Sequence, residues 1–267
     1  MRFGFALVAV CFGAFVPGPG SAQEIAPVSN QVPVSNHVMA QNLAAVGRPA
    51  LAAPRPPWSA IGRINRTPGG FCSGTLIAPD RVLTTANCLW DRSMGRWFHP
   101  GDLHFLAGYH LGRYIEYRRV VAMEFSENVE INQRGYPRRA SNDWAVLTLE
   151  RPIAANRKIY PIKKIRLSKR PRPGRLGPLV RAGFSPLRPH ALTTARCRAV
   201  AFFNRSALMH NCGAVSADSG FPILVQTSDG WRVLGLQMTT YNRDTKKNSI
   251  GMVLLVTAMS KNVQIRY

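Results

Sequence analysis

Acidic residues are scarce in this sequence. Its 267 residues include 13 Asp and Glu against 35 Lys and Arg, which gives a formal net charge of +22. The electrostatic field of such a net charge attracts anionic partners and steers them at low salt, although the charge carries no information about the fold. No RNA- or DNA-binding motif accompanies the charge. Nucleic acid, anionic polysaccharide and lipid surfaces therefore all stay open as partners.

Long apolar runs are lacking as well. The longest, residues 3–16, has 14 residues, which are too few to span a membrane. Arg2 precedes this run, and the small residues Gly20, Ser21 and Ala22 follow it as a candidate cleavage site. Residues 1–22 are therefore predicted to be a signal peptide, with a short buried helix or a lipid anchor at Cys11 as alternatives. The expected location is secreted or periplasmic.

The five cysteines lack a metal-binding pattern, because no CxxC pair and no histidine cluster accompanies them. Loss of Cys11 with the signal peptide leaves four, and an exported chain meets an oxidising compartment that favours disulfides. Three pairings can be drawn. The local one closes two loops of similar size, each of which contributes about 3 kcal/mol in the chain-entropy model. We expect the disulfides Cys72–Cys88 and Cys197–Cys212 and no metal.

Amphipathic helices of three turns are absent too. From Trp58 onward, β-like segments such as "FCSGTLIA" and "GMVLLVTAM" are separated mostly by Gly, Pro, Asn or Asp. Many short strands at close spacing predict an all-β barrel or sandwich. Residues 23–57 have no apolar period and are predicted to be a propeptide or flexible leader.

A basic block divides the β-like part of the chain. Residues 157–175 hold nine Lys and Arg and no acid, with three prolines among them. We predict a basic connection at residues 154–178 between two β halves, residues 58–153 and 179–267. A solvated loop that binds nothing accounts for the same composition.

Three segments together resemble the trypsin-like serine proteases, especially their compact exported bacterial members. "FCSGTLIAPDRVLTTANCLW" matches the pattern C-[ST]-G-T-L-I followed by V-L-T-A-A-H-C, "NDWAVLTL" matches the strand that supplies the catalytic aspartate, and "SADSGFPIL" matches the segment around the nucleophile. The resemblance covers about residues 58–257. It implies a chymotrypsin-like fold of two antiparallel six-stranded β-barrels with the active-site cleft between them.

By this resemblance Ser219 is the nucleophile and Asp143 the carboxylate that orients the base. The position of the base holds Asn87, where the family has histidine. An asparagine amide neither accepts a proton near neutral pH nor delivers one to the leaving amine. Loss of the histidine alone costs about 10⁶ in kcat in a related triad. The predicted function is an inactive or severely impaired serine endopeptidase homologue. The alternative is a protease-fold binding protein for anionic polymers or envelope surfaces.

Other positions of the resemblance also depart from the family. The N–H groups of Ala217 and Ser219 would form the oxyanion hole, but the family has glycine at the position of Ala217. Phe221 is large where Gly or Ser is usual. The floor of the specificity pocket falls on Gly213, so a preference for basic residues is not expected. Met238 would narrow this pocket, and plain core packing explains it equally well.

Two further expectations concern activation. The folded part of the chain offers five histidines that could supply a shifted base, His99, His104, His110, His190 and His210, although the favoured interpretation is that they are ordinary surface or hydrogen-bonded histidines. In the family a freed N-terminus pairs with the carboxylate beside the nucleophile, here Asp218, and Val46-Gly47 resembles a mature start. The resemblance implies a monomer without a cofactor that takes a polypeptide substrate if it is active.

Overall fold

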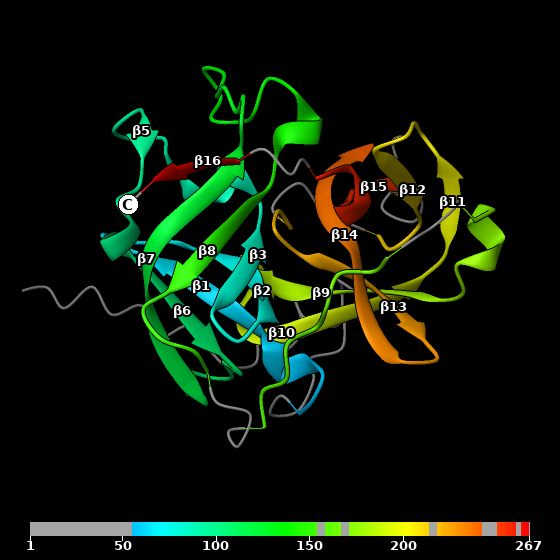
Figure 1. Cartoon of the computed structure of the whole chain (residues 1–267), viewed down its shortest axis with the longest axis horizontal. Coiled ribbons are helices and arrows are strands. Elements are labelled where there is room, and N and C mark those ends of the chain that lie inside the picture. Colours follow the sequence, from blue (N-terminus) through cyan, green and yellow to red (C-terminus); the bar gives the residue numbers. More distant parts are fainter. Residues whose placement is uncertain are drawn as a thin grey trace, which may run out of the picture.

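The computed structural model describes residues 55–153, 158–166, 171–213, 218–241, 250–259 and 263–266. The predicted signal peptide and almost all of the predicted leader lie outside these residues. Regular structure in the described part consists of strands and short 3-10 helices (Figure 1). No helix in these ranges has the length and apolar character needed to cross a membrane.

The first barrel is a closed ring of six antiparallel strands. Strand order is β7-β6-β1-β2-β3-β8, and β8 pairs back onto β7. Side chains of β7 alternate between buried and exposed along its first half, as expected for a strand with one face on a core. The strands are β1 (Ile61–Arg66), β2 (Phe71–Ala78), β3 (Arg81–Thr84), β6 (Leu103–Ala107), β7 (Glu116–Ser126) and β8 (Ala145–Leu149). A small hairpin of β4 (Trp90–Asp91) and β5 (Arg96–Trp97) projects from this barrel.

The second barrel follows the order β10-β9-β13-β14-β15-β12-β11. Strands β10 and β11 stand at opposite ends of this order, yet only Arg198 separates them in the chain. They are therefore two halves of one bent strand, which closes the sheet into a second six-stranded barrel and confirms the predicted fold class. Its strands are β9 (Leu179–Ser185), β10 (Arg188–Cys197), β11 (Ala199–Phe202), β12 (Ala207–His210), β13 (Pro222–Thr227), β14 (Gly230–Tyr241) and β15 (Ile250–Leu255).

The last strand departs from the predicted division of the chain. Strand β16 (Val263–Arg266) pairs with β7 of the first barrel, with Val263 opposite Ser126. The expected boundaries put all of residues 179–267 in the second barrel. The pattern of a four-residue strand does not specify which sheet edge it joins, because an edge offers unpaired backbone groups to any strand that reaches it.

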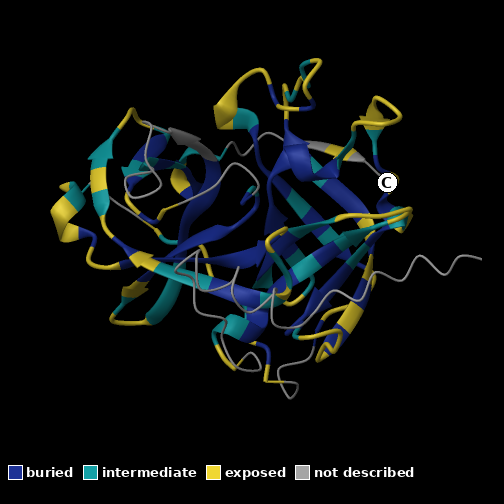
Figure 2. Ribbon diagram, turned by 180° about the vertical axis from the view of Figure 1, so that it is seen from behind, coloured by how far each residue is buried: buried dark blue, intermediate teal, exposed yellow. Residues whose placement is uncertain are grey.

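The main apolar core cluster spans both barrels, and the second barrel has a further cluster of its own. A single buried cluster contains Phe105 and Leu106 of the first barrel together with Phe184 and Leu224 of the second. The backbone N–H of Phe184 also donates to Oγ of Ser73 over 2.8 Å, which ties β9 to β2. Buried residues run along the strands of both barrels, and exposed residues gather mainly in the turns (Figure 2). The junction between the barrels is therefore a packed interface.

Both expected disulfides are present. Cys72–Cys88 joins β2 to the 3-10 helix η2 (Ala86–Leu89), with the two Cα atoms 6.0 Å apart. Cys197–Cys212 joins the end of β10 to the residues after β12, with the Cα atoms 4.8 Å apart. The first of these disulfides lies at the junction between the barrels, beside the candidate site.

Candidate active site

Strand register brings Asn87 and Asp143 together. Strands β3 and β8 are antiparallel, and Thr84 at the end of β3 pairs with Ala145 at the start of β8. Asn87 follows Thr84 by three residues on η2, and Asp143 precedes Ala145 by two at the end of η4 (Ala140–Asn142). The backbone N–H of Asn87 donates to Oδ1 of Asp143 over 2.9 Å, and its amide Nδ2 donates to Oδ2 over 2.6 Å. Both carboxylate oxygens of Asp143 therefore accept from Asn87.

Asp143 is buried, and the side chain of its neighbour Asn87 is neutral. Burial raises the pKa of Asp143 to about 6, against the opposing effect of the N–H donors of Asn87 and of Ala86. Only 5% of Asp143 and 7% of Asn87 are exposed. A neutral amide stabilises the carboxylate by hydrogen bonds alone, which is why the cost of burial prevails.

Ser219 lies on the second barrel and is held against the first by its neighbour Gly220. Gly220 has φ +82°, and a Cβ built on it would lie 2.7 Å from the carbonyl oxygen of Ser73 and 3.0 Å from Oγ1 of Thr84. Only glycine fits this approach, in both conformation and space. The carbonyl oxygen of Ser219 lies 3.9 Å from Sγ of Cys88, the residue next to Asn87.

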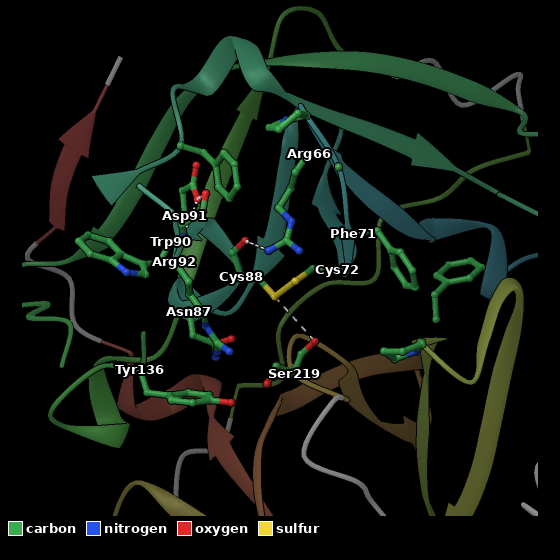
Figure 3. A pocket seen from close by; sticks show the side chains of 16 residues that line it. Arg66, Phe71, Cys72, Asn87, Cys88, Trp90, Asp91, Arg92, Tyr136 and Ser219 are labelled. Atoms are coloured by element: carbon green, nitrogen blue, oxygen red, sulfur yellow. Dashed lines mark hydrogen bonds between the residues drawn. A yellow bond between two sulfur atoms is a disulfide. The ribbon is translucent and has the colours of Figure 1, made fainter. Parts of the chain in front are cut away.

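Asn87 and Ser219 line one cavity of about 520 Å³, which we call the cleft pocket. Figure 3 shows both residues beside the Cys72–Cys88 disulfide. Two arginines, Arg66 and Arg92, lie on its wall. Aromatic side chains make up much of the remaining wall: Phe71, Trp90, Phe98, Tyr136 and Phe184. The pocket thus combines a hydroxyl, an amide, two cations and an apolar lining.

The remaining predicted site residues lie elsewhere. Ala217 is outside the described residues. Neither Gly213 nor Met238 lines the cleft pocket. Gly213 is exposed, with φ +60°, and its carbonyl oxygen accepts from Nη2 of Arg181 over 3.4 Å. Met238 is buried in the main core cluster.

Phe221, the large residue two positions after Ser219, is accommodated in the core. Its side chain is 1% exposed. A Cβ on Gly183 would lie 2.5 Å from its ring, so the absence of a side chain at Gly183 leaves the space that Phe221 fills. The backbone carbonyl of Phe221 accepts from Gln237 N–H over 2.8 Å. This substitution therefore has a packing partner within β9.

No histidine of the described ranges lines the cleft pocket. His99 accepts a hydrogen bond from Gly101 N–H over 3.1 Å, and His104 stacks on Tyr117. His110 forms a bridge with Arg113, and His190 bonds the hydroxyl of Tyr109 over 2.7 Å. His210 is fully buried, and burial lowers its pKa to about 4.

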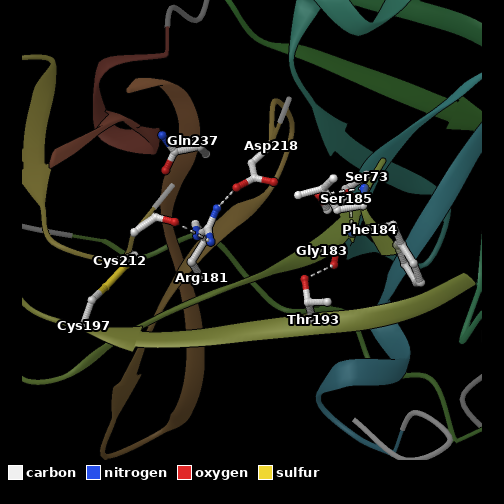
Figure 4. Close-up of polar contacts among 12 residues, drawn as sticks. Ser73, Arg181, Gly183, Phe184, Ser185, Thr193, Cys197, Cys212, Asp218 and Gln237 are labelled. Atoms are coloured by element: carbon white, nitrogen blue, oxygen red, sulfur yellow. Dashed lines mark hydrogen bonds and ion pairs between the residues drawn. A yellow bond between two sulfur atoms is a disulfide. The ribbon is translucent and has the colours of Figure 1, made fainter. Parts of the chain in front are cut away.

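The residue that precedes Ser219 in the chain, Asp218, belongs to a buried ion pair. The carboxylate of Asp218 pairs with the guanidinium of Arg181 on β9 (Figure 4), and the two side chains are 0% and 2% exposed. The guanidinium also lies over the ring of Phe221, with Cζ 5.4 Å from the centroid. Asp218, which the resemblance pairs with a freed N-terminus, is thus bound to an internal arginine. Sequence reasoning missed this pair. Its signal was a single charge inside the apolar strand "LVRAGF", since buried charges require partners.

One group of metal-ligand types, Cys197, His210 and Cys212, has its ligand atoms within 4.8 Å of one another. The two sulfurs are joined in a disulfide. Nδ1 of His210 accepts from Cys212 N–H over 3.1 Å, and Nε2 bonds Oε1 of Gln237 over 2.7 Å. Each potential ligand atom in this group is therefore already engaged within the protein.

Comparisons with known proteins agree with the architecture of the first barrel. Residues 45–177, which contain the first barrel with Asn87 and Asp143, match the model of the trypsin family. Glucanase inhibitor protein 3 of Phytophthora infestans is 38% identical over 82 residues, which are 31% of this chain and 28% of that protein. Glucanase inhibitor protein 4 of the same organism is 36% identical over 94 residues, 35% of this chain and 31% of that protein. The chain thus spans less than one third of the length of these curated relatives.

Proposed function

We propose that this chain is a serine endopeptidase homologue without effective catalysis. The match of residues 45–177 to the trypsin family and the two-barrel fold support this proposal. In this proposal Ser219 stands at the position of the nucleophile, Asp143 at that of the orienting carboxylate, and Asn87 at that of the general base. The observation that carries the proposal is the hydrogen bond from Nδ2 of Asn87 to Asp143.

That contact decides what Asn87 offers to Ser219. With Nδ2 directed at Asp143, the amide oxygen is the polar atom that remains for the pocket. An amide oxygen accepts a hydrogen bond from a hydroxyl but does not take its proton near neutral pH. A serine hydroxyl needs a base that does so before it attacks a carbonyl carbon. The substitution of glycine by Ala217 in the proposed oxyanion hole weakens catalysis further.

The role proposed for the cleft is binding of a polypeptide without hydrolysis. The names of the two Phytophthora relatives describe inhibitors of a glucanase, that is, proteins that act on an enzyme. A cleft that has a binding pocket but no general base suits such a role, because a polypeptide bound in it is not cleaved and released. The expected likeness to bacterial members stays a prediction.

The test measures hydrolysis of casein and of small esters by the wild-type chain, with Ser219→Ala as the matched control. We expect no difference between the two, and no labelling of the wild-type serine by a fluorophosphonate. Wild-type turnover that disappears in Ser219→Ala would refute the proposal.

A second function, binding of an anionic polymer, is favoured by the charge of the second barrel. From Arg151 to Ala217 the sequence contains no acidic residue. Strands β10 and β11 lie close to the 3-10 helix η6 (Pro173–Arg175), which packs against β11. Five exposed arginines lie on these elements or within three residues of them in the chain: Arg172, Arg175, Arg196, Arg198 and Arg205. Anionic polysaccharide, nucleic acid and anionic lipid all offer the complementary charge.

Retention on heparin tests this second function. A variant with Arg196, Arg198 and Arg205 changed to Gln should elute at much lower salt than a variant with three exposed first-barrel arginines, Arg113, Arg134 and Arg139, changed to Gln. Equal elution of the two variants would show that only net charge matters.

Export is part of the proposal. The apolar run at residues 3–16 and the two disulfides both favour an oxidising compartment outside the cytoplasm.

A further inference from the structure

Two arginines face the cleft pocket from different elements. Arg66 ends β1 and is partly buried, whereas Arg92 follows β4 and is exposed. Burial lowers the pKa of Arg66, and the positive charge of Arg92 lowers it further. Two like charges that repel one another across a cavity are stabilised by an anion between them.

Among the described residues, one donor of Arg66 is engaged and another has no acceptor. Nη1 donates to the carbonyl oxygen of Cys88 over 3.2 Å, while Nε is buried and has no acceptor in the described part of the chain. Gly70 has φ +85°, and a Cβ there would collide with Nη2 of Arg66. Glycine at position 70 therefore leaves room for the guanidinium, and Cζ lies 5.5 Å from the centroid of Phe98. Arg66 is therefore held in place by its surroundings.

The carboxylate of Asp91 on the pocket wall favours the charged form of Arg66, but one of its oxygens is engaged within the β4–β5 turn. Oδ1 of Asp91 accepts from the N–H and the hydroxyl of Ser93 over 2.9 and 2.6 Å, and from Met94 N–H over 3.2 Å. These bonds hold the β4–β5 turn and stabilise the ionised form of Asp91. The guanidinium of Arg92 lies over the ring of Tyr136, with Cζ 4.6 Å from the centroid. A guanidinium on an aromatic face keeps its edge donors free for an oxyanion.

We propose that the cleft pocket binds a carboxylate side chain of an acidic polypeptide segment, with Arg66 as the principal ligand and Arg92 as the second. This inference rests on the proposed function, since it names what the cleft recognises. The aromatic walls suit the apolar stem of a glutamate and its neighbours. A cavity of about 520 Å³ holds one or two side chains, whereas a polyanion needs a continuous row of cations.

Two capped hexapeptides test the inference, Ala-Phe-Glu-Glu-Ala-Ala and its analogue with Gln in place of Glu. Their dissociation constants are measured by calorimetry at neutral pH and physiological salt. Charge-assisted hydrogen bonds to the guanidinium should make the Glu peptide bind about ten-fold tighter or more. Arg66→Gln should remove this preference and Arg92→Gln should reduce it. The control Arg113→Gln, an equal charge change at an exposed arginine of the first barrel that does not line this pocket, should leave it intact.

Equal affinity for the two peptides, or a preference that survives in both Arg66→Gln and Arg92→Gln, would overturn the carboxylate site. Arg92→Gln keeps the test valid if Arg66→Gln fails to fold, because Arg92 is exposed. Heparin that displaces the Glu peptide from wild type but not from Arg205→Gln would assign the preference to the second barrel. Hydrolysis of the bound Glu peptide by wild type but not by Ser219→Ala would leave this site standing and refute the proposed function instead.

Discussion

The amide Nδ2 of Asn87 donates to Oδ2 of Asp143 over 2.6 Å, while its backbone N–H donates to Oδ1 over 2.9 Å. Only the first of these bonds depends on the side chain. An imidazole at position 87 could make the same contact through Nδ1–H and present Nε2 to the pocket, as a general base requires.

The first prediction follows from that geometry. Asn87→His should give measurable ester hydrolysis and fluorophosphonate labelling at Ser219, since the base is the larger defect. Removal of a base costs about 10⁶ in kcat, against roughly 10²–10³ for one oxyanion donor.

The matched control is Asn87→His with Ser219→Ala, which should be inactive. If Asn87→His alone is silent, addition of Ala217→Gly should reveal activity. Lack of activity in the variant that combines Asn87→His and Ala217→Gly would mean that Ser219 is not placed as a nucleophile.

A second prediction concerns the pH dependence of stability. The folded pKa of Asp143 is about 6, above its ordinary value of 3.8. Between pH 4 and 6 the folded state therefore holds a proton that the unfolded state releases, and the free energy of unfolding falls as pH rises. Two pH units correspond to roughly 3 kcal/mol. His210 has the opposite effect on the free energy of unfolding, which it makes rise with pH, because its pKa of about 4 in the folded state lies below its ordinary value of 6.5.

Chemical denaturation at pH 4 and pH 7 separates the two groups. The free energy of unfolding of Asp143→Asn, minus that of wild type, should rise by roughly 3 kcal/mol from the lower to the higher pH. The difference cancels the contribution of His210, which is present in both proteins. A difference that stays constant or falls with pH would contradict the raised pKa.

A third prediction isolates the close approach at Gly220. Gly220→Ala should destabilise the fold by roughly 3–5 kcal/mol, because it adds a contact with Ser73 to the cost of a positive φ. Gly112→Ala is the matched control. Gly112 has φ +84°, and a Cβ at this position would have no atom within 4 Å, so its cost should be about 1–2 kcal/mol. Equal melting temperatures for the two variants would refute a tight junction at Gly220.

A fourth prediction concerns the ion pair of Arg181 and Asp218. Arg181→Met should lower the free energy of unfolding by about 3–5 kcal/mol, because the buried carboxylate of Asp218 loses its cation. Addition of Asp218→Asn should recover part of this loss, since the remaining group is neutral. Thermal unfolding of the two variants decides the matter. A double variant less stable than Arg181→Met would show that Asp218 has sufficient stabilisation without the arginine.

Local patterns predicted much of this protein. Short strands at close spacing predicted an all-β fold, and the even cysteine count with its two local loops predicted the pairs that the structure contains. Such features depend on residues close together in the chain. The resemblance added the two-barrel arrangement and the candidate residues Asn87, Asp143 and Ser219, whose roles stay predictions.

Only the tertiary structure decided how distant segments meet. It placed β16 on the first barrel, joined Arg181 to Asp218 and set Arg66 against Arg92 across the cleft pocket. The sequence by itself determined the alternation of side chains along each strand, which follows from backbone geometry within a few residues. Which strands become neighbours, and which charges are buried together, depends on register and on packing between segments far apart in the chain, and no local pattern contains that information.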